Sequence, residues 1–372
     1  MHAEPSAVAG QTWPRVCVVG PLPPPSGGMA NQCDQLVRLL RADGANVELV
    51  RNNAPYRPPL LGHVPVLRAG VRLLPYLFNL WRAAGRAEVL HVLANSGWAW
   101  HLFAAPALLI GLLRGTPVII NYRGGLAEQF FAVAPSHVLS LMQRATLRVT
   151  PSAFLRRVFA QHGLQADVIP NIVDLERFGP RRARDFGVAP HVVVARNLEP
   201  IYGLSTALQA LAILRQHYPG ATLTVAGSGP QKAELVAQAA ALGLSGAVHF
   251  PGRVDHADMP ALYARADCAL NPSTVDNMPN SVLEAFASGL PLVSTDVGGV
   301  PDIVTDGVDG LLVPAGDAQA MAAALVRVLG DRELAGRLAE AGFTQVQAYG
   351  WPQVRGQWLD AYRKAAVRGR TG

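Results

Sequence analysis

The segment DNMPNSVLEAFASGLPLVSTDVGGVPD, from Asp276 to Asp302, says most about the fold of this chain. It begins as a polar turn and continues into a short helical pattern, which Gly289 and Pro291 end. The residues LVST that follow predict a buried strand. A turn, a helix and a buried strand in this order are typical of a parallel sheet wrapped by helices.

The predicted helix has one apolar and one polar side. At 100° per residue, Val282 and Phe286 can face a core while Glu284 lies on the opposite side, together with Asn280, Ser281 and Ser288. We therefore expect Glu284 to look into a cleft. The start of this helix suits an anion such as phosphate, because free backbone N–H groups and the positive end of the helix dipole point at it.

The same alternation of short apolar runs and helical patterns continues along the whole chain, which predicts the α/β class. In the first half we expect strands at Val16–Gly20, Val47–Val50, Val89–Leu93, Val118–Asn121 and Val168–Pro170. In the second half we expect them at Val192–Ala195, Thr222–Ala226, Val248–Phe250, Cys268–Asn271 and Leu292–Thr295. Residues 171–187 lose the apolar periodicity and read as a linker.

Composition narrows the class of protein. The 372 residues are 50% apolar, which suffices for two hydrophobic cores. Three scattered cysteines indicate neither a disulfide framework nor a zinc site, and we see no secretory signal, so a cytoplasmic location is expected. The net charge of +6 is compatible with acidic substrates or anionic lipid. The sequence has no basic run interleaved with aromatic residues, which is the pattern that would indicate nucleic-acid binding.

Two apolar stretches raise the question of a membrane. The stretch from Ala99 to Leu113 is too short for a span and predicts a buried helix. The segment from Val66 to Arg86 mixes arginines with Leu, Phe, Tyr and Trp, and Pro75 is expected to break it. It fits either a helix lying on an anionic membrane or a helix packed on its own sheet with its charges in water.

The Asp276–Asp302 segment resembles the signature of retaining glycosyltransferases of family four, and the similarity extends over nearly the whole chain. The resemblance implies the GT-B fold, in which two Rossmann-like domains face each other across a deep cleft. It implies an acceptor-side domain at 1–175, a nucleotide-sugar domain at 176–350, and a terminal helix, 351–368, that crosses back to the first domain. From pattern alone, 351–368 is an amphipathic terminal helix.

Roles for the signature follow from the same resemblance. It makes Glu284 the ligand of the donor ribose, Asp276 the acid beside the transferred sugar, and the intervening residues the cradle for diphosphate and sugar: Asn277, Met278, Pro279, Asn280 and Ser281. Many relatives have Glu where this chain has Asp276, which shortens the reach of the carboxylate by about 1.5 Å.

Two arginines complete the expected catalytic set. Arg196 follows the first strand of the second half and resembles the family arginine that neutralises the leaving diphosphate. The family lysine that assists it is absent, and Ile201 or Tyr202 takes its place. Arg123 stands where many relatives have a histidine against the donor sugar, and it can bind an anion or merely cap strand ends in the cleft wall.

Two loops complete the expected binding site. Gly27 and Gly28 resemble the family's glycine-rich first loop, although they also fit a turn that needs positive φ. The sequence FPGRV resembles the base-binding loop and assigns Arg253 and Val254 to the nucleotide.

The resemblance implies transfer of a sugar from a UDP- or GDP-sugar to a glycan or lipid-linked acceptor, with retention and without a metal or other cofactor. Bacterial exopolysaccharide or cell-envelope polysaccharide synthesis is the expected setting, with peripheral contact at the cytoplasmic face of the inner membrane. A GT-B scaffold that binds without catalysis is an alternative, motivated by the missing lysine and by Arg123. An NAD-dependent dehydrogenase is a poorer match, because no G-x-G-x-x-G follows the first strand.

Overall fold

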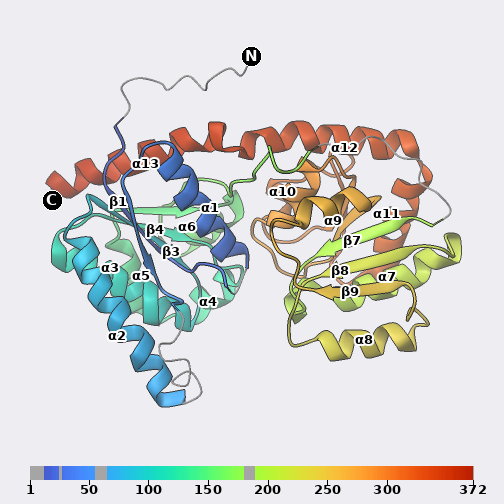
Figure 1. Cartoon of the computed structure of the whole chain (residues 1–372), viewed down its shortest axis with the longest axis horizontal. Coiled ribbons are helices and arrows are strands. Elements are labelled where there is room, and N and C mark those ends of the chain that lie inside the picture. The colour runs from blue at the N-terminus through green and yellow to red at the C-terminus, as the bar shows by residue number, and fades with distance from the viewer. Residues whose placement is uncertain (1–11, 25–26, 55–64, 180–188, 372) are drawn as a thin grey trace.

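The structure is a computed structural model, and it describes residues 12–24, 27–54, 65–179 and 189–371. These residues form two parallel β-sheets that lie side by side with helices packed around each (Figure 1). Apolar clusters fill both faces of each sheet. The predicted α/β architecture of two Rossmann-like units is thus confirmed. Residues 180–187 of the predicted linker lie outside the described part of the chain.

The first sheet has the order β2-β1-β3-β4-β5-β6, with every neighbouring pair parallel. Its strands are β1 (Val16–Gly20), β2 (Val47–Arg51), β3 (Val89–Ala94), β4 (Val118–Tyr122), β5 (Leu147–Thr150) and β6 (Asp167–Val168).

The second sheet has the order β12-β11-β10-β7-β8-β9 and is also parallel throughout. Its strands are β7 (His191–Ala195), β8 (Thr222–Ala226), β9 (Val248–Gly252), β10 (Cys268–Asn271), β11 (Leu292–Thr295) and β12 (Leu311–Val313).

The helices follow the strands in alternation. In the first half they are α1 (Gly28–Ala42), α2 (Pro65–Ala84), α3 (Ala105–Arg114), α4 (Ala127–Val133), α5 (Ser136–Gln143) and α6 (Ala153–Gln161), with a π-helical turn at Trp100–Ala104 before α3. In the second half they are α7 (Leu204–His217), α8 (Lys232–Ala241), α9 (Met259–Arg265), α10 (Asn280–Ala287), α11 (Ala318–Gly330), α12 (Arg332–Val346) and α13 (Trp351–Thr371). Short 3₁₀ turns lie at Pro200–Tyr202, Val300–Asp302 and Gln347–Tyr349.

The sequence prediction differs from the structure at the short strands. It missed β5, whose four residues include Arg148, and β12, which has only three residues. It placed the last strand of the first sheet at Val168–Pro170, whereas β6 ends at Val168. Strands of this length carry too few apolar residues to show a period.

The prediction that Pro75 breaks the helix is wrong, because α2 continues through it. Proline removes one helical hydrogen bond and crowds the carbonyl one turn earlier. Pro75 is exposed, so water can satisfy that carbonyl. The expectation of a buried helix at Ala99–Leu113 is also only partly right, since Leu109 and Leu113 are exposed on α3.

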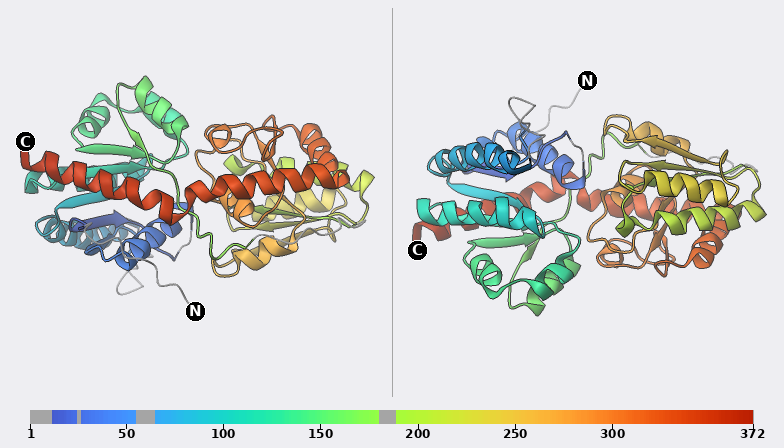
Figure 2. Two further views of the ribbon diagram at one scale, coloured as in Figure 1. Left: turned by 90° about the horizontal axis from the view of Figure 1, so that it is seen from above. Right: turned by 90° about the horizontal axis from the view of Figure 1, so that it is seen from below.

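Helix α13 packs on the first sheet although it follows the second in sequence. Figure 2 shows the chain crossing between the halves as α12 gives way to α13. Trp358 and Tyr362 of α13 are buried in the core beside β1 and β3. His91 of β3 stacks on Trp358 with ring centroids 4.5 Å apart, and its Nδ1 lies 2.8 Å from the Tyr362 hydroxyl. Burial lowers the pKa of His91 to about 3, so this histidine is a neutral core residue.

Within the described ranges, no helix is both long enough and apolar enough to cross a membrane.

Candidate active site

The strand order of the second sheet defines where a ligand can bind. The chain builds β7, β8 and β9 outward in one direction and then returns to place β10, β11 and β12 on the other side of β7. Ligands of such sheets bind at the carboxyl ends of the two strands where the order reverses. Arg196 follows β7 and Asn271 ends β10, so both lie at this switch point.

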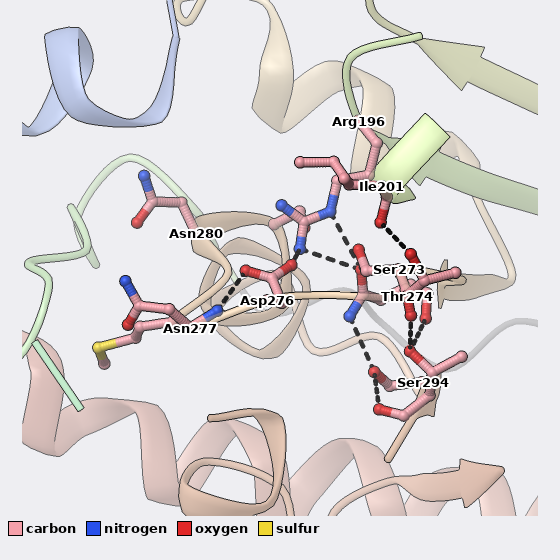
Figure 3. Close-up of polar contacts among 12 residues, drawn as sticks. Arg196, Ile201, Ser273, Thr274, Asp276, Asn277, Asn280 and Ser294 are labelled. Atoms are coloured by element: carbon pink, nitrogen blue, oxygen red, sulfur yellow. Dashed lines mark hydrogen bonds and ion pairs between the residues drawn. The ribbon is translucent and has the colours of Figure 1, made fainter. Parts of the chain in front are cut away.

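The Arg196 guanidinium is fixed by its neighbours (Figure 3). Its Nε and Nη2 both donate to Asn271 Oδ1 at 3.0 Å, and Nη2 also forms an ion pair with Asp276. Only 11% of the Arg196 side chain and 12% of the Asp276 side chain are exposed. Nη1 has no hydrogen-bond partner among the residues that the structure describes.

A second layer of contacts holds Asn271. Its Nδ2 donates to Ser294 Oγ at 2.9 Å, and its Oδ1 accepts from Ser273 Oγ at 2.9 Å. The amide is therefore oriented with its oxygen toward Arg196. This preorganisation means that Arg196 does not need to find its position when a ligand arrives.

An aromatic ring lies beside Arg196, at one of the two positions, Ile201 and Tyr202, where the resemblance led us to expect a lysine. The Arg196 guanidinium lies over the Tyr202 ring, 5.2 Å from its centroid. Ile201 instead uses its backbone carbonyl, which accepts from Thr274 N at 2.8 Å and so supports the loop after β10. Tyr202, and not Ile201, therefore lies against Arg196. Of these three residues, only Arg196 carries a positive charge.

Two glycines pack against the loop between β10 and α10, which carries Asp276 and is called the acidic loop below. A side chain at Gly298 would lie 1.9 Å from the Asp276 carbonyl, and one at Gly299 would lie 1.8 Å from the Asn277 carbonyl. Gly298 also has φ +56°, which glycine adopts most easily. The Gly299 N–H donates to the Asp276 carbonyl at 3.1 Å. The double glycine of the signature is therefore needed to place Asp276 and Asn277.

Helix α10 starts beside this loop without a capping side chain. Pro279 is its N-cap, and proline offers no side-chain oxygen to the first N–H groups. The Ser281 hydroxyl is buried and has no partner within the described part of the molecule. Uncapped N–H groups and an unsatisfied hydroxyl together make this helix start suitable for an anion.

Glu284 faces a narrow crevice between the two halves. The crevice is lined from the first half by Asn31, Gln32 and Gln35 of α1 and from the second half by Asn280, Leu283 and Glu284 of α10. Of the polar face predicted for this helix, Ser288 does not point there: it is buried, and its hydroxyl donates to the Glu284 carbonyl at 2.8 Å.

The Glu284 carboxylate lies in a nearly dry environment, with 13% of its side chain exposed. It accepts from the Tyr263 hydroxyl at 3.0 Å, and His256 Nδ1 lies 3.9 Å away. Burial raises the pKa of Glu284 to about 7, although the Tyr263 hydrogen bond and the Arg196 charge oppose this shift. The Glu284 carboxyl therefore exchanges its proton near neutral pH, and burial is the main cause.

Side chains of the acidic loop join the two halves instead of lining the crevice. The Asn277 amide accepts from Ser152 Oγ at 3.0 Å and donates to the Arg123 carbonyl at 3.2 Å. Asn171 Nδ2 donates to the Met278 carbonyl at 2.9 Å and to Asn280 Oδ1 at 2.7 Å. Asn277 and Met278 are buried, so only their backbone groups are available to a ligand in this arrangement.

Arg123 belongs to the same interdomain contact. Its guanidinium donates to Asn171 Oδ1 and, at 3.5 Å, to Gln32 Oε1. Burial lowers the pKa of Arg123 to about 10, which leaves it charged at neutral pH. The structure thus places Arg123 against the segment that connects the halves, next to the crevice wall formed by Gln32.

The two loops predicted to bind the donor lie around this crevice. Gly27 has φ −171° and Gly28 begins α1, so neither is explained by a need for positive φ. The Gly28 carbonyl accepts from Asn280 Nδ2 at 3.5 Å across the interface. On the other side, the loop after β9 carries Arg253 and Val254 and reaches Glu284 through His256.

Sequence reasoning missed several residues of this site. Tyr263 of α9, His256 and Asn271 contact Glu284 or Arg196, but each comes from an ordinary strand, helix or loop pattern. Asn171 was seen only as part of the connecting segment. Among the residues that the structure describes, no group of three or more His, Cys, Asp or Glu side chains is placed to hold a metal ion.

Comparison with solved structures identifies the fold. HepE of Anabaena, solved in complex with UDP and glucose, superposes with a TM-score of 0.72 at 20% identity over 94% of this chain and 99% of that one. Two paired parallel sheets of this kind are the GT-B fold of glycosyltransferases.

Sequence comparison gives the family. Residues 26–177 match the model "Glycosyltransferase Family 4", and residues 186–345 match "Glycosyl transferases group 1". The chain is 31% identical to the glycogen synthase of Mycobacterium tuberculosis (strain H37Rv), over 83% of this chain and 75% of that protein. It is 28% identical to the phosphatidyl-myo-inositol mannosyltransferase of Mycobacterium leprae, over 92% and 94%. The chain therefore belongs to glycosyltransferase family 4, and it is a glycosyltransferase.

The raised pKa of Glu284 predicts a pH-dependent effect on stability. Because the pKa rises from 4.5 to about 7 on folding, wild-type protein loses stability as the pH increases through this range. Glu284→Gln stays neutral and avoids that loss. Its free energy of unfolding relative to wild type should increase between pH 5 and pH 8 by up to about 3 kcal/mol. Urea denaturation at several pH values measures this difference.

The matched control is Glu340→Gln, at an exposed position on α12, whose difference from wild type should stay constant with pH. A constant difference for Glu284→Gln as well would show that Glu284 ionises normally.

Proposed function

We propose that this chain is a retaining, metal-independent glycosyltransferase that uses a UDP- or GDP-sugar as donor. The observation that carries the proposal is the convergence of Arg196, Asp276 and Glu284 with an uncapped helix start at the switch point of the second sheet. This arrangement offers a cation and free N–H groups for a diphosphate and a carboxylate for a ribose. The UDP and glucose bound by HepE, which has the same fold, support the choice of ligand class.

Different groups of the site bind different parts of the donor. The Glu284 carboxylate accepts hydrogen bonds from the ribose hydroxyls, and Arg253 and Val254 lie beside the base. The backbone of Asn277–Ser281 and the start of α10 hold the diphosphate, together with Arg196. The diphosphate displaces Asp276 from Arg196, and the freed Asp276 carboxylate then turns toward the sugar.

Transfer requires the bond between the anomeric carbon and the diphosphate oxygen to break. The acceptor oxygen forms its bond on the same face of the sugar, and its proton passes to the departing diphosphate oxygen. Negative charge grows on that diphosphate in the transition state. Arg196 and the dipole of α10 stabilise this charge, and because Asn271 already holds Arg196 in place, little reorganisation is needed.

The remaining predicted residues complete the cleft. Residues 1–175 and 351–368 form the acceptor-side domain, and 176–350 form the donor domain. Gly27 and Gly28 leave open space at the start of α1, where a side chain would meet nothing closer than Asn280 at 3.5 Å. Arg123 completes the site from the first domain, where its permanent charge assists in binding the anionic donor.

The acceptor is a glycan or a lipid-linked sugar in bacterial exopolysaccharide or cell-envelope polysaccharide synthesis. The names of two relatives support this range: one is a glycogen synthase and the other a phosphatidyl-myo-inositol mannosyltransferase.

Replacing Glu284 by Ala tests the ribose assignment. Loss of a charged acceptor should weaken UDP and GDP binding about 10- to 100-fold, measured by isothermal titration calorimetry. The control is Glu340→Ala, which removes an exposed carboxylate on α12 and should bind as wild type does. Unchanged affinity in Glu284→Ala would contradict the proposed donor site.

Replacing Arg196 by Ala tests the role of the guanidinium. If it acts on the transition state, kcat should fall about 10²- to 10³-fold while donor affinity changes much less. Arg196→Lys keeps one charge but loses the paired contact with Asn271, so it should recover only part of the rate. Equal losses in binding and turnover would mean that Arg196 only anchors the donor.

We also propose that the first domain contacts the cytoplasmic face of the membrane. On α2, Phe78 and Trp81 are 61% and 43% exposed, and the neighbouring α3 exposes Leu113. Arg82 lies over the Phe78 ring and Arg114 over the Trp81 ring, so cations flank the apolar surface. Apolar side chains ringed by arginine suit the surface of an anionic bilayer.

The membrane contact is tested by flotation with phosphatidylglycerol vesicles. Phe78→Ser/Trp81→Ser should weaken binding about tenfold or more, because two large side chains lose their burial in lipid. Val236→Ser/Leu242→Ser removes two exposed apolar residues at α8 and should bind as wild type does. Equal binding by all three proteins would exclude this face.

A further inference from the structure

A second cavity lies in the first half of the molecule, away from the crevice. It measures about 630 Å³ and is bounded by α6, the edge strand β6 and the carboxyl-terminal part of α13. Figure 1 shows this end of α13 over the first sheet, far from the second. The cavity shares no lining residue with the crevice that contains Glu284. Its size is in the usual range for small-ligand sites.

The lining of this cavity is strongly basic. It includes one carboxylate, Asp167, and five cationic side chains: Arg148, Arg156, Arg157, Lys364 and Arg368. Lys364 Nζ lies 3.1 Å from Asp167 Oδ2, and Arg157 Nη1 lies 3.1 Å from Asp302 Oδ1. The two carboxylates near the cavity are therefore already engaged by two of the cations.

Arg148 is held in a fixed orientation at the wall. Its Nε donates to the Gln165 carbonyl at 2.6 Å, and its Nη1 donates to three carbonyls at the end of α5, those of Met142, Gln143 and Ala145. Burial and the nearby Arg368 charge lower the pKa of Arg148. An anion bound beside this fixed guanidinium would offset part of the repulsion that Arg368 exerts on it.

Arg156 adds a cation from α6. It is exposed, and its side chain makes no hydrogen bond or ion pair within the described parts of the chain. Its neighbour Arg157 differs, since it reaches Asp302 of the second half. Arg156 is thus available to a ligand without breaking an existing contact.

We propose that this cavity is a binding site for a phosphate group, carried either by a soluble phosphorylated molecule or by a lipid headgroup. Guanidinium groups match phosphate oxygens in pairs, and an ammonium adds a third point of charge. The cations of the lining come from α6, β5 and α13, so one phosphate group can be contacted from more than one element. The proposal does not depend on the activity at the crevice, since the two sites have no residue in common.

Calorimetric titration with inorganic phosphate tests the site. Arg156→Ala/Lys364→Ala should weaken phosphate binding about tenfold, since two charge-assisted contacts are lost. The matched control is Lys232→Ala/Arg337→Ala, which removes two exposed cations on α8 and α12 and leaves the cavity intact. The crevice is the same in all these proteins, so a loss confined to the first variant identifies the cavity.

A third variant predicts the opposite sign. Asp167→Asn removes the carboxylate from the lining and frees Lys364, so phosphate should bind a few times more tightly than in wild type. A merely structural disturbance would not strengthen binding. Equal weakening in both double variants, or no change in the cavity double variant, would overturn the proposal.

Vesicle flotation distinguishes the two sources of phosphate. If the ligand is a lipid headgroup, Arg156→Ala/Lys364→Ala should float less with phosphatidylglycerol vesicles than Lys232→Ala/Arg337→Ala does. If both float equally while phosphate titration still separates them, the ligand is soluble. Absence of any difference between the two variants in both experiments would refute the site.

Discussion

The ion pair between Arg196 and Asp276 is the contact on which the geometry of the candidate active site depends. The two residues meet because β7 and β10 are neighbouring parallel strands whose carboxyl ends lie at the same edge, at the point where the order of the sheet reverses. About a tenth of each of these two charged side chains is exposed, so each stabilises the other where water cannot, and the Asn271 amide adds hydrogen bonds to Arg196. Under the proposed function, an anionic donor takes the place of the Asp276 carboxylate at Arg196, so the guanidinium keeps an anionic partner throughout.

The sequence was sufficient for the larger features of the fold. Strands such as Val16–Gly20 and Thr222–Ala226 are long, buried and bounded by turns, so their pattern is unambiguous. The position of Glu284 opposite Val282 and Phe286 on one helix was predicted for the same reason, since helical geometry alone fixes it. Short strands such as β12 and the proline inside α2 were misjudged, because their outcome depends on neighbours that a local pattern does not contain.

The contacts within the site were less predictable. Asn277 and Met278 belong to the signature, yet their side chains are used to join the two halves through Asn171 and Ser152. Tyr263 sets the environment of Glu284 from a different helix. These contacts join residues that are far apart in the chain, so the local sequence pattern around either residue does not predict them. Tyr202 under Arg196 is similar: the sequence shows that the lysine is absent, but not that a ring supports the remaining cation.

The return of α13 to the first sheet has a mechanical consequence. The chain passes between the halves twice, near residue 173 and near residue 350, and the two passages are pinned to each other where Val173 N donates to the Tyr349 carbonyl at 3.0 Å. The two connecting segments are therefore held side by side, and further contacts such as Ser152 to Asn277 join the halves nearby. A change in the angle between the lobes has to be absorbed by both segments together, which a single flexible linker would not require.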